Sequence, residues 1–308
     1  MKELDKISKW IKKNSHRDFS NKNIVITGSN SGIGFYLAAI LVTKGANIIM
    51  PVRNMKKGEE ARDKILLDCP NANITLMSLD LSSFRSIHAF VNEIISNKID
   101  VDIFVNNAGV FHMPKSETKD GLELTIGTNH IGVKLLNDLL KDYFISLNHE
   151  VEVLFTSSVA AYRGKINYDD FYSNKHYNKI QVYSNSKLCV VHNYLDYSNN
   201  VKGTNIKTYL THPGIAYSPL IKKAYPGIFG YIAMVFMKIL FHQPPKACLS
   251  MFVALDKQKN NAYYGPRGLI EASGYPKELR IPKKLYKNID KTIEISLETI
   301  RQIEQTIN

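Results

Sequence analysis

The sequence predicts an alternating α/β protein built on a parallel β-sheet. An apolar, β-branched stretch at 23–27 runs directly into three glycines and then into a helix-prone segment at 35–43. A second apolar strand at 46–50 precedes a helical pattern at 56–68, and a third strand follows at 73–79. Two strand–helix units in succession favour parallel pairing with right-handed crossovers.

Length and composition fit a globular protein in a reducing compartment. The chain has 308 residues, of which 44% are hydrophobic, enough for one large domain or two small ones. Its cysteines, Cys69, Cys189 and Cys248, are scattered and lack CxxC pairing, so no metal site is expected. The polar, lysine-rich N-terminus does not resemble a signal peptide, and no apolar run is long enough for a membrane span. We therefore expect a cytoplasmic protein.

The net charge of +12 is compatible with nucleic acid, an anionic membrane surface or an anionic cofactor as partner. No basic helix interleaved with aromatic residues is present, so we expect no nucleic-acid partner. In an N-terminal arm at 1–20, Leu4, Ile7, Trp10 and Ile11 share one helical face among five lysines. This arm could lie on a membrane surface or clasp the domain's own surface, and we favour the second.

The glycines after the first strand predict a phosphate-binding turn. Gly28, Gly32 and Gly34 would let a diphosphate approach the backbone and let the helix pack close to its strand. Free N–H groups at the helix start, with Ser31 as a plausible N-cap, would face the phosphates. Glycine turns that bind nothing are common, but the position after a buried strand favours the functional interpretation.

The end of the second strand indicates which dinucleotide is preferred. No carboxylate for a ribose 2′-OH occurs before Glu59. Arg53, with Lys56 or Lys57 nearby, suits a 2′-phosphate instead, so NADP(H) is preferred over NAD(H). The alternative is that Arg53 merely starts the next helix on a solvated face.

Polar residues also follow the third and fourth strands. Asp80 could touch the adenine edge or cap the helix expected at 82–96. The strand at 101–105 runs into Asn106-Asn107-Ala108-Gly109, whose amides can bond the backbone of neighbouring strands and leave room for a ribose. An Asx-Gly turn is the simpler alternative there.

Two further polar positions lie on predicted helices. A helical pattern at 122–147 carries Asn129, an intrinsically unfavourable residue in mid-helix. A fifth strand at 151–155 leads to Ser158, and a probable helix at 181–197 follows. Within that helix Tyr183 and Lys187 are four residues apart and project from one face, so the ammonium is expected to lower the phenol pKa toward neutrality. Tyr183 is thus a candidate general acid/base.

Together these features resemble the short-chain dehydrogenase/reductase family. The resemblance covers roughly residues 21–274, and the Gly-x-x-x-Gly-x-Gly spacing is typical of the single-domain branch. Within it, Thr-Asn-His-Ile-Gly, His212-Pro-Gly214 and Tyr263-Tyr-Gly-Pro-x-Gly268 look most like the retinol-dehydrogenase-like group and its bacterial members. The motifs that carry it are Thr27-Gly-x-x-x-Gly-Ile-Gly34, Asn106-Asn-Ala-Gly109, Asn129, Ser158, Tyr183-x-x-x-Lys187 and Pro213-Gly214.

The resemblance implies a fold and a set of roles. The fold is a single Rossmann-type doubly wound parallel sheet of about seven strands with helices on both faces. Tyr183 would pass a proton to or from the substrate oxygen, Ser158 would hold that oxygen, Lys187 would bond the nicotinamide ribose, and Asn129 would anchor a water. The expected cofactor contacts are Gly28, Asn30, Ser31, Gly32, Ile33, Gly34, Arg53, Asp80, Leu81, Asn107, Ala108, Gly109, Tyr183, Lys187, Pro213, Gly214 and Ser218.

The remaining segments bear on the substrate and on assembly. In this family the stretch at about 211–245 is a substrate lid, and its apolar run at 228–241 favours a lipophilic aldehyde, ketone or alcohol, although core packing, a membrane-surface contact or a dimer contact is equally compatible. Tyr162 and Tyr172 are expected to border the substrate. The chain ends in a helical tail at 275–308, in which residues 282–308 are predicted to form an amphipathic helix docked on the domain rather than a coiled coil.

Three functions compete on the sequence alone. An NADP(H)-dependent carbonyl reductase or alcohol dehydrogenase is favoured because all four catalytic positions are filled. A non-catalytic NADP(H)-binding regulatory module of the same fold is the alternative, and a basic protein that binds a membrane or nucleic acid is the third. A homodimer or homotetramer is compatible with the resemblance.

Overall fold

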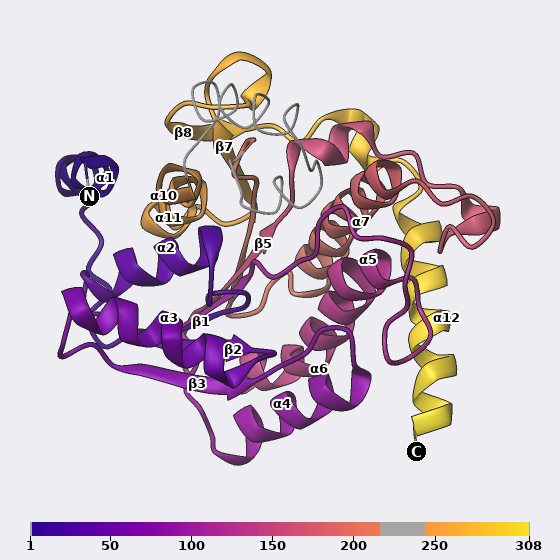
Figure 1. Cartoon of the computed structure of the whole chain (residues 1–308), viewed down its shortest axis with the longest axis horizontal. Coiled ribbons are helices and arrows are strands. Elements are labelled where there is room, and N and C mark those ends of the chain that lie inside the picture. Colours follow the sequence, from indigo (N-terminus) through magenta and orange to yellow (C-terminus); the bar gives the residue numbers. More distant parts are fainter. Residues whose placement is uncertain (1, 216–243, 308) are drawn as a thin grey trace.

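The computed structural model describes residues 2–215 and 244–307, arranged around one eight-stranded sheet (Figure 1). The strand order is β3-β2-β1-β4-β5-β6-β7-β8, and all neighbours are parallel except β7 and β8. The strands are β1 (Asn23–Ile26), β2 (Asn47–Val52), β3 (Ile74–Ser78), β4 (Ile103–Asn106), β5 (Val151–Thr156), β6 (Ile206–Thr211), β7 (Ala262–Pro266) and β8 (Pro276–Leu279). The predicted Rossmann-type sheet is confirmed, with one short antiparallel strand where the tail was expected to be helical.

Helices cover both faces of the sheet. On β1, Ile24 and Ile26 belong to one hydrophobic cluster and Val25 to the other, because successive side chains point to opposite faces. Both clusters exclude water, which is why β1 reads as an unbroken apolar run. The helical elements are α1 (Lys2–Asn14), α2 (Gly32–Val42), α3 (Met55–Asp68), α4 (Phe84–Ser96), α5 (Leu124–Ile126), η1 (Gly127–Ile131), α6 (Gly132–Ser146), η2 (Val159–Arg163), η3 (Tyr168–Asp170), α7 (Lys179–Asn200), α10 (Pro244–Ala247), α11 (Leu249–Lys257), η4 (Leu269–Glu271), η5 (Lys283–Tyr286) and α12 (Ile289–Ile307).

The N-terminal arm packs on the domain's own surface, as favoured from the sequence. Ile7 and Ile11 of α1 are buried in the cluster that also contains α2 and α11. Trp10 stacks on Tyr275 with ring centroids 4.9 Å apart. The side chain of Leu4 lies outside the described part of the structure.

The C-terminal helix α12 docks against α7 (Figure 1). Its contact face combines apolar Ile293 and Ile300 with the fully buried hydroxyls of Thr292 and Ser296, whereas Leu297 is exposed. Docking of the predicted helix therefore depends on polar contacts as well as on its apolar stripe. No helix in the described ranges is both long and apolar enough to cross a membrane.

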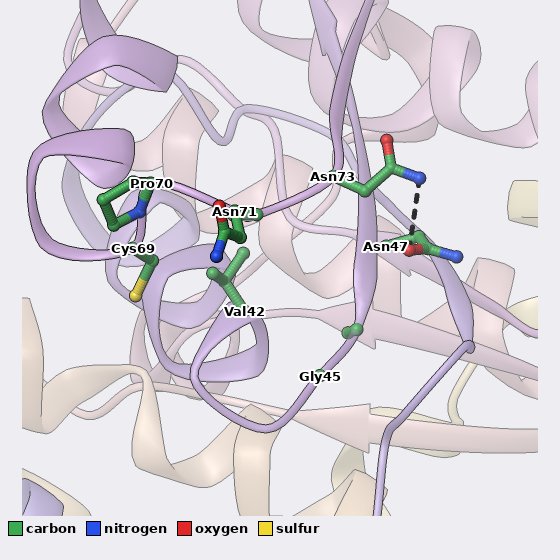
Figure 2. Close-up of a pocket in the computed structure, with 9 residues that line it drawn as sticks. Val42, Gly45, Asn47, Cys69, Pro70, Asn71 and Asn73 are labelled. Carbon is green, nitrogen blue, oxygen red and sulfur yellow. Dashed lines mark hydrogen bonds between the residues drawn. The ribbon is translucent and has the colours of Figure 1, made fainter.

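A pocket opens at the amino ends of β2 and β3 (Figure 2). Asn73 Nδ2 donates to Asn47 Oδ1 at 3.2 Å, and Asn47 Nδ2 donates to Asn23 Oδ1 at 3.0 Å. This amide ladder ties three strands together at the edge opposite the glycine turn. Since parallel α/β sheets bind ligands at the carboxyl ends of their strands, we assign the pocket no part in the dinucleotide site.

A buried ion pair fixes the end of the arm to the sheet. Arg17 Nη1 donates to Glu152 Oε2 of β5 at 2.9 Å, and Nη2 contacts Oε1 of the same carboxylate. Glu152 is 3% exposed, and the Arg17 guanidinium also donates to the Leu255 carbonyl at the end of α11.

Replacing Arg17 by alanine should lower the free energy of unfolding by about 3 kcal/mol, because it leaves a buried carboxylate unpaired. Lys22→Ala is the matched control, since Lys22 pairs with Asp102 from an exposed position and should cost less than about 1 kcal/mol. Urea unfolding of both variants measures the difference, and equal losses would contradict the prediction.

Candidate active site

The sheet order places four predicted site segments at one edge. Strands β1, β4, β5 and β6 are consecutive neighbours, so Gly28, Asn107, Ser158 and Pro213, which follow their carboxyl ends, share that edge. The order reverses between β1 and β4, where α/β sheets open a ligand crevice. The structure therefore brings the expected catalytic and cofactor motifs together.

The three glycines of the first turn have distinct roles. Gly28 has φ +68° and a Cβ there would lie 2.8 Å from Ala108 Cα, while a Cβ on Gly34 would lie 2.5 Å from Asn107 Nδ2. Close packing therefore requires glycine at both positions. Gly32 has φ +61°, but apart from its neighbours in the chain no atom of the described residues lies within 4 Å of its missing side chain, so this side of the turn is open in the described structure.

The turn has polar groups without a protein partner. Ser31 is the N-cap of α2, yet its side chain makes no capping hydrogen bond. The buried hydroxyl of Ser29 has no partner within the described structure. Unfilled donors at a helix start, beside an open glycine, fit the diphosphate of a dinucleotide. Asn30 and Ile33 lie half-buried in the same turn.

Thr27 joins this turn to the β4 segment, a role that the sequence analysis did not assign. Its Oγ1 accepts hydrogen bonds from the N–H groups of Asn107 and Ala108, both at 3.0 Å, and donates to Val105 O at 3.1 Å. Asn107 Nδ2 donates to Thr27 O at 2.9 Å, which confirms the expected amide-to-backbone bond. Asn106 instead pairs with Asn137 on α6.

Arg53 and Asp80 differ in how they are held. Arg53 is exposed after β2 and has no ion pair or hydrogen bond within the described residues, so it is free to meet a phosphate. The Asp80 carboxylate accepts from Ser82 and lies 3.3 Å from Lys119; these bonds outweigh burial and hold its pKa below the usual range. Asp80 therefore does not cap α4, whose N-cap is Ser83.

Leu81 contributes to the core rather than presenting its side chain at the edge. The side chain is buried, and a Cβ on Gly132 would collide with its carbonyl oxygen. The Leu81 backbone thus lies against the start of α6, and any cofactor contact would be made by the main chain.

Asn129 lies in a break of the predicted helix. The continuous helix expected at 122–147 is divided into α5, the π-helical turn η1 and α6. The Asn129 amide exchanges hydrogen bonds with the Val110 backbone at 2.7 and 2.9 Å and donates to Ser186 Oγ at 3.0 Å. These bonds compensate for an asparagine in mid-helix, and π-helical turns often occur at functional sites.

Tyr183 and Lys187 project from α7 toward β5. Asn178 caps this helix, which therefore starts two residues before the predicted 181. The Lys187 side chain is buried, and Nζ donates to Thr156 O at 3.1 Å. A Cβ on Gly109 would lie 3.0 Å from Oδ1 of Asn129 and 3.5 Å from Nζ of Lys187, so Gly109 packs directly beside both side chains.

The ionisation of this pair differs from the expectation. Burial raises the pKa of Tyr183 to about 12, and a hydrogen bond with Ser158 acts in the opposite direction. Burial also lowers the pKa of Lys187 to about 8. The expected lowering of the phenol pKa is therefore not found: burial of the phenol is the larger effect on Tyr183, and the Lys187 ammonium bonds the Thr156 carbonyl.

Aromatic side chains beside Tyr183 were missed by sequence reasoning. Phe111 meets the Tyr183 ring edge to face at 4.6 Å, and His112 stacks on Phe111 at 3.7 Å. Burial and the nearby charge of Lys179 lower the His112 pKa, which favours the neutral ring. The only available signal was their position directly after Asn106-Asn-Ala-Gly109.

The turn after β6 requires a glycine. Gly214 has φ +76°, and a Cβ there would lie 2.5 Å from Ala272 O. Ser218 and the residues 216–243 of the expected lid lie outside the described residues.

The two tyrosines expected to border the substrate have other contacts. Tyr172 donates to Thr299 Oγ1 of α12 at 2.7 Å, so it faces the C-terminal helix instead. Tyr162 contacts the segment after β7.

A protein-family model described as short chain dehydrogenase matches residues 22–227. The chain belongs to the short-chain dehydrogenase family. Among curated relatives, retinol dehydrogenase 12 of Homo sapiens is 37% identical to this chain over 201 residues, which are 65% of this chain and 63% of that protein. The chain thus matches less than two thirds of that relative's length. The chloroplastic short-chain dehydrogenase TIC 32 A of Brassica napus is 30% identical over 90% of both chains.

Solved structures agree on the family fold. An uncharacterized protein from Mycobacterium paratuberculosis superposes with a TM-score of 0.73 at 24% identity, covering 95% of this chain and 96% of that one. A short-chain dehydrogenase/reductase from Burkholderia phymatum in complex with NAD gives a TM-score of 0.62 at 17% identity, covering 80% of this chain and 89% of that one.

Replacing Lys187 by methionine should raise the free energy of unfolding at pH 7 by as much as about 3 kcal/mol, because burial lowers the lysine pKa from 10.5 to about 8. Between pH 8 and 10.5 the unfolded chain keeps a proton that the folded chain has lost, so wild-type stability rises with pH and the difference shrinks. Urea unfolding at pH 7 and pH 10 measures it.

Lys134→Met is the control, in which the free energy of unfolding should change in the opposite direction. Lys134 is equally buried but pairs with Asp138 and Asp196, so its loss leaves two carboxylates unpaired and destabilises the fold. A Lys187→Met variant that is less stable than wild type at pH 7 would refute the prediction.

Proposed function

We propose that this chain is an NADP(H)-dependent oxidoreductase that transfers a hydride between nicotinamide and a carbonyl or alcohol carbon. The observation that carries the proposal is the convergence of Ser158, Tyr183, Lys187 and Asn129 at the carboxyl edge of the sheet, beside the open glycine turn. Membership of a dehydrogenase family supports the same reaction class.

The residues present fit a phosphorylated dinucleotide. The glycine turn offers its free amides and the Ser29 hydroxyl to the diphosphate. Arg53 follows β2 directly, is exposed and has no ion pair among the described residues; a 2′-phosphate would lie there, and no carboxylate occupies that position. NADP(H) is therefore preferred over NAD(H). Related structures are complexes with NAD and with NADP, so the fold itself does not decide between them.

The chain's own groups supply the proton. A bound nicotinamide supplies or accepts the hydride. Ser158 holds the substrate oxygen next to the Tyr183 hydroxyl, which donates its proton as the carbonyl is reduced. Lys187, once its ammonium bonds the ribose, stabilises the resulting phenolate. Asn129 is already fixed by Val110 and Ser186, and we assign it the water through which Lys187 regains a proton.

The substrate proposed is a lipophilic aldehyde, ketone or alcohol. The Phe111 and His112 rings beside Tyr183 favour apolar groups next to the reacting carbon. The relatives named retinol dehydrogenases point to the same class.

The first test is NADPH oxidation with a panel of lipophilic aldehydes and ketones. Tyr183→Phe should lower kcat at least a thousandfold while leaving NADPH binding within threefold, because only the proton donor is removed. Tyr172→Phe is the matched control, since its hydroxyl bonds Thr299 of α12, and it should retain wild-type activity. Wild-type protein that binds NADPH tightly but turns over no substrate would favour the regulatory module instead.

A second test addresses the cofactor. Arg53→Ala should weaken NADPH binding ten- to a hundredfold and leave NADH binding unchanged, since a charged hydrogen bond contributes about 1.5 to 3 kcal/mol. Arg62→Ala removes an exposed cation from α3 that already pairs with Asp63, and serves as the control. Parallel losses for both nucleotides would disprove the 2′-phosphate contact; fluorescence titration gives the dissociation constants.

A further inference from the structure

A buried histidine lies behind the turn at Pro213 and Gly214. The His212 ring has no exposed surface, and Nδ1 accepts a hydrogen bond from the Gly214 N–H at 3.2 Å. Since Nδ1 is an acceptor, the proton of the neutral ring is on Nε2. Nε2 lies 3.1 Å from Oε2 of Glu271, and the N–H is not aimed straight at that oxygen, so the contact is electrostatic rather than a well-aligned hydrogen bond.

Glu271 is held in an unfavourable backbone conformation. Ile270 and Glu271 have φ values of +49° and +55°, in the left-handed region that side chains rarely adopt. Consecutive residues of this kind persist only where surrounding contacts hold them, and they concentrate at functional sites. The contact with His212, opposed by burial, keeps the Glu271 pKa below its usual range, so the carboxylate is ionised at neutral pH.

The Glu271 carboxylate also contacts the segment that follows β5. Tyr162, four residues after Ser158, donates its hydroxyl to Glu271 Oε2 at 2.5 Å and lies 2.9 Å from the Tyr263 hydroxyl. Room for the histidine ring depends on Gly265 of β7, because a Cβ there would overlap Nε2. Segments after β5, β6 and β7 thus meet at one carboxylate.

We propose that Glu271 is a positioning residue for the reacting centre: through His212 it holds the Pro213 and Gly214 turn, and through Tyr162 it holds the segment that begins at Ser158. The inference rests on the proposed function, in which Ser158 holds the substrate oxygen, and on the expectation from the sequence that Pro213 and Gly214 contact the cofactor. Glu271 itself acts through its neighbours, so its removal disturbs alignment rather than the chemistry of Tyr183.

Glu271→Ala should lower kcat at least tenfold when the rate is divided by the concentration of NADPH-binding sites. The NADPH dissociation constant should change less than threefold, because the glycine turn and Arg53 hold the other end of the cofactor. Glu271→Gln keeps an acceptor for Tyr162 and His212 and should recover most of the rate. Glu278→Ala is the matched control, since Glu278 pairs with Lys259 at the surface of the adjacent strand β8. A wild-type rate for Glu271→Ala, or a loss of NADPH-binding sites that fully accounts for the lost activity, would overturn the proposal.

A second readout does not depend on turnover. Nitrogen-15 NMR of the imidazoles, assigned with a His212→Ala variant, should show His212 with its proton on Nε2 in wild type. In Glu271→Ala the released turn should weaken the Gly214 N–H bond to Nδ1, which gives a mixture of tautomers. A proton on Nδ1 in wild type would refute the contact. If wild type showed this tautomer but reduced no substrate, the proposed function alone would fail.

Discussion

One threonine hydroxyl holds the two halves of the dinucleotide site together. Thr27 Oγ1 accepts from two consecutive amides of the β4 segment while donating to Val105, so the ends of β1 and β4 cannot separate without breaking three bonds. This junction is also where the strand order reverses. The closeness of Gly28 to Ala108 and of Gly34 to Asn107 follows from it, and both positions therefore exclude a side chain.

Burial of the candidate catalytic pair, Tyr183 and Lys187, lowers the stability of the folded protein. Lys187 is buried with one hydrogen bond to a carbonyl and no carboxylate partner among residues 2–215 and 244–307, in contrast to Lys134, which two aspartates neutralise. Tyr183 on α7 is half-buried, and burial raises its pKa. Groups whose ordinary ionisation is opposed by the fold are typical of functional sites. In the proposed reaction, the bound ribose and phosphates would supply the polar surroundings that the protein itself does not provide.

Local patterns predicted the sheet well because each buried strand and each glycine turn is encoded in adjacent residues. The Asn107 bond to the β1 backbone could also be anticipated, since it depends only on two strand ends lying side by side. The Tyr183 pKa could not, because it depends on burial by distant segments and on the direction of the Lys187 ammonium. The contacts of Glu271 could not be predicted for the same reason, because Glu271 lies beside His212 and Tyr162 only after three loops have packed together. The roles of the site residues and the cofactor preference stay predictions.

The stacking of Trp10 on Tyr275 has a practical consequence. Trp10 is the chain's single tryptophan, and it connects the N-terminal helix to the residue that precedes β8. Its emission therefore reports on the contact between the arm and the body of the domain, without interference from other indole rings. The protein carries a built-in optical probe at a junction between the beginning of its sequence and the last strand of its sheet.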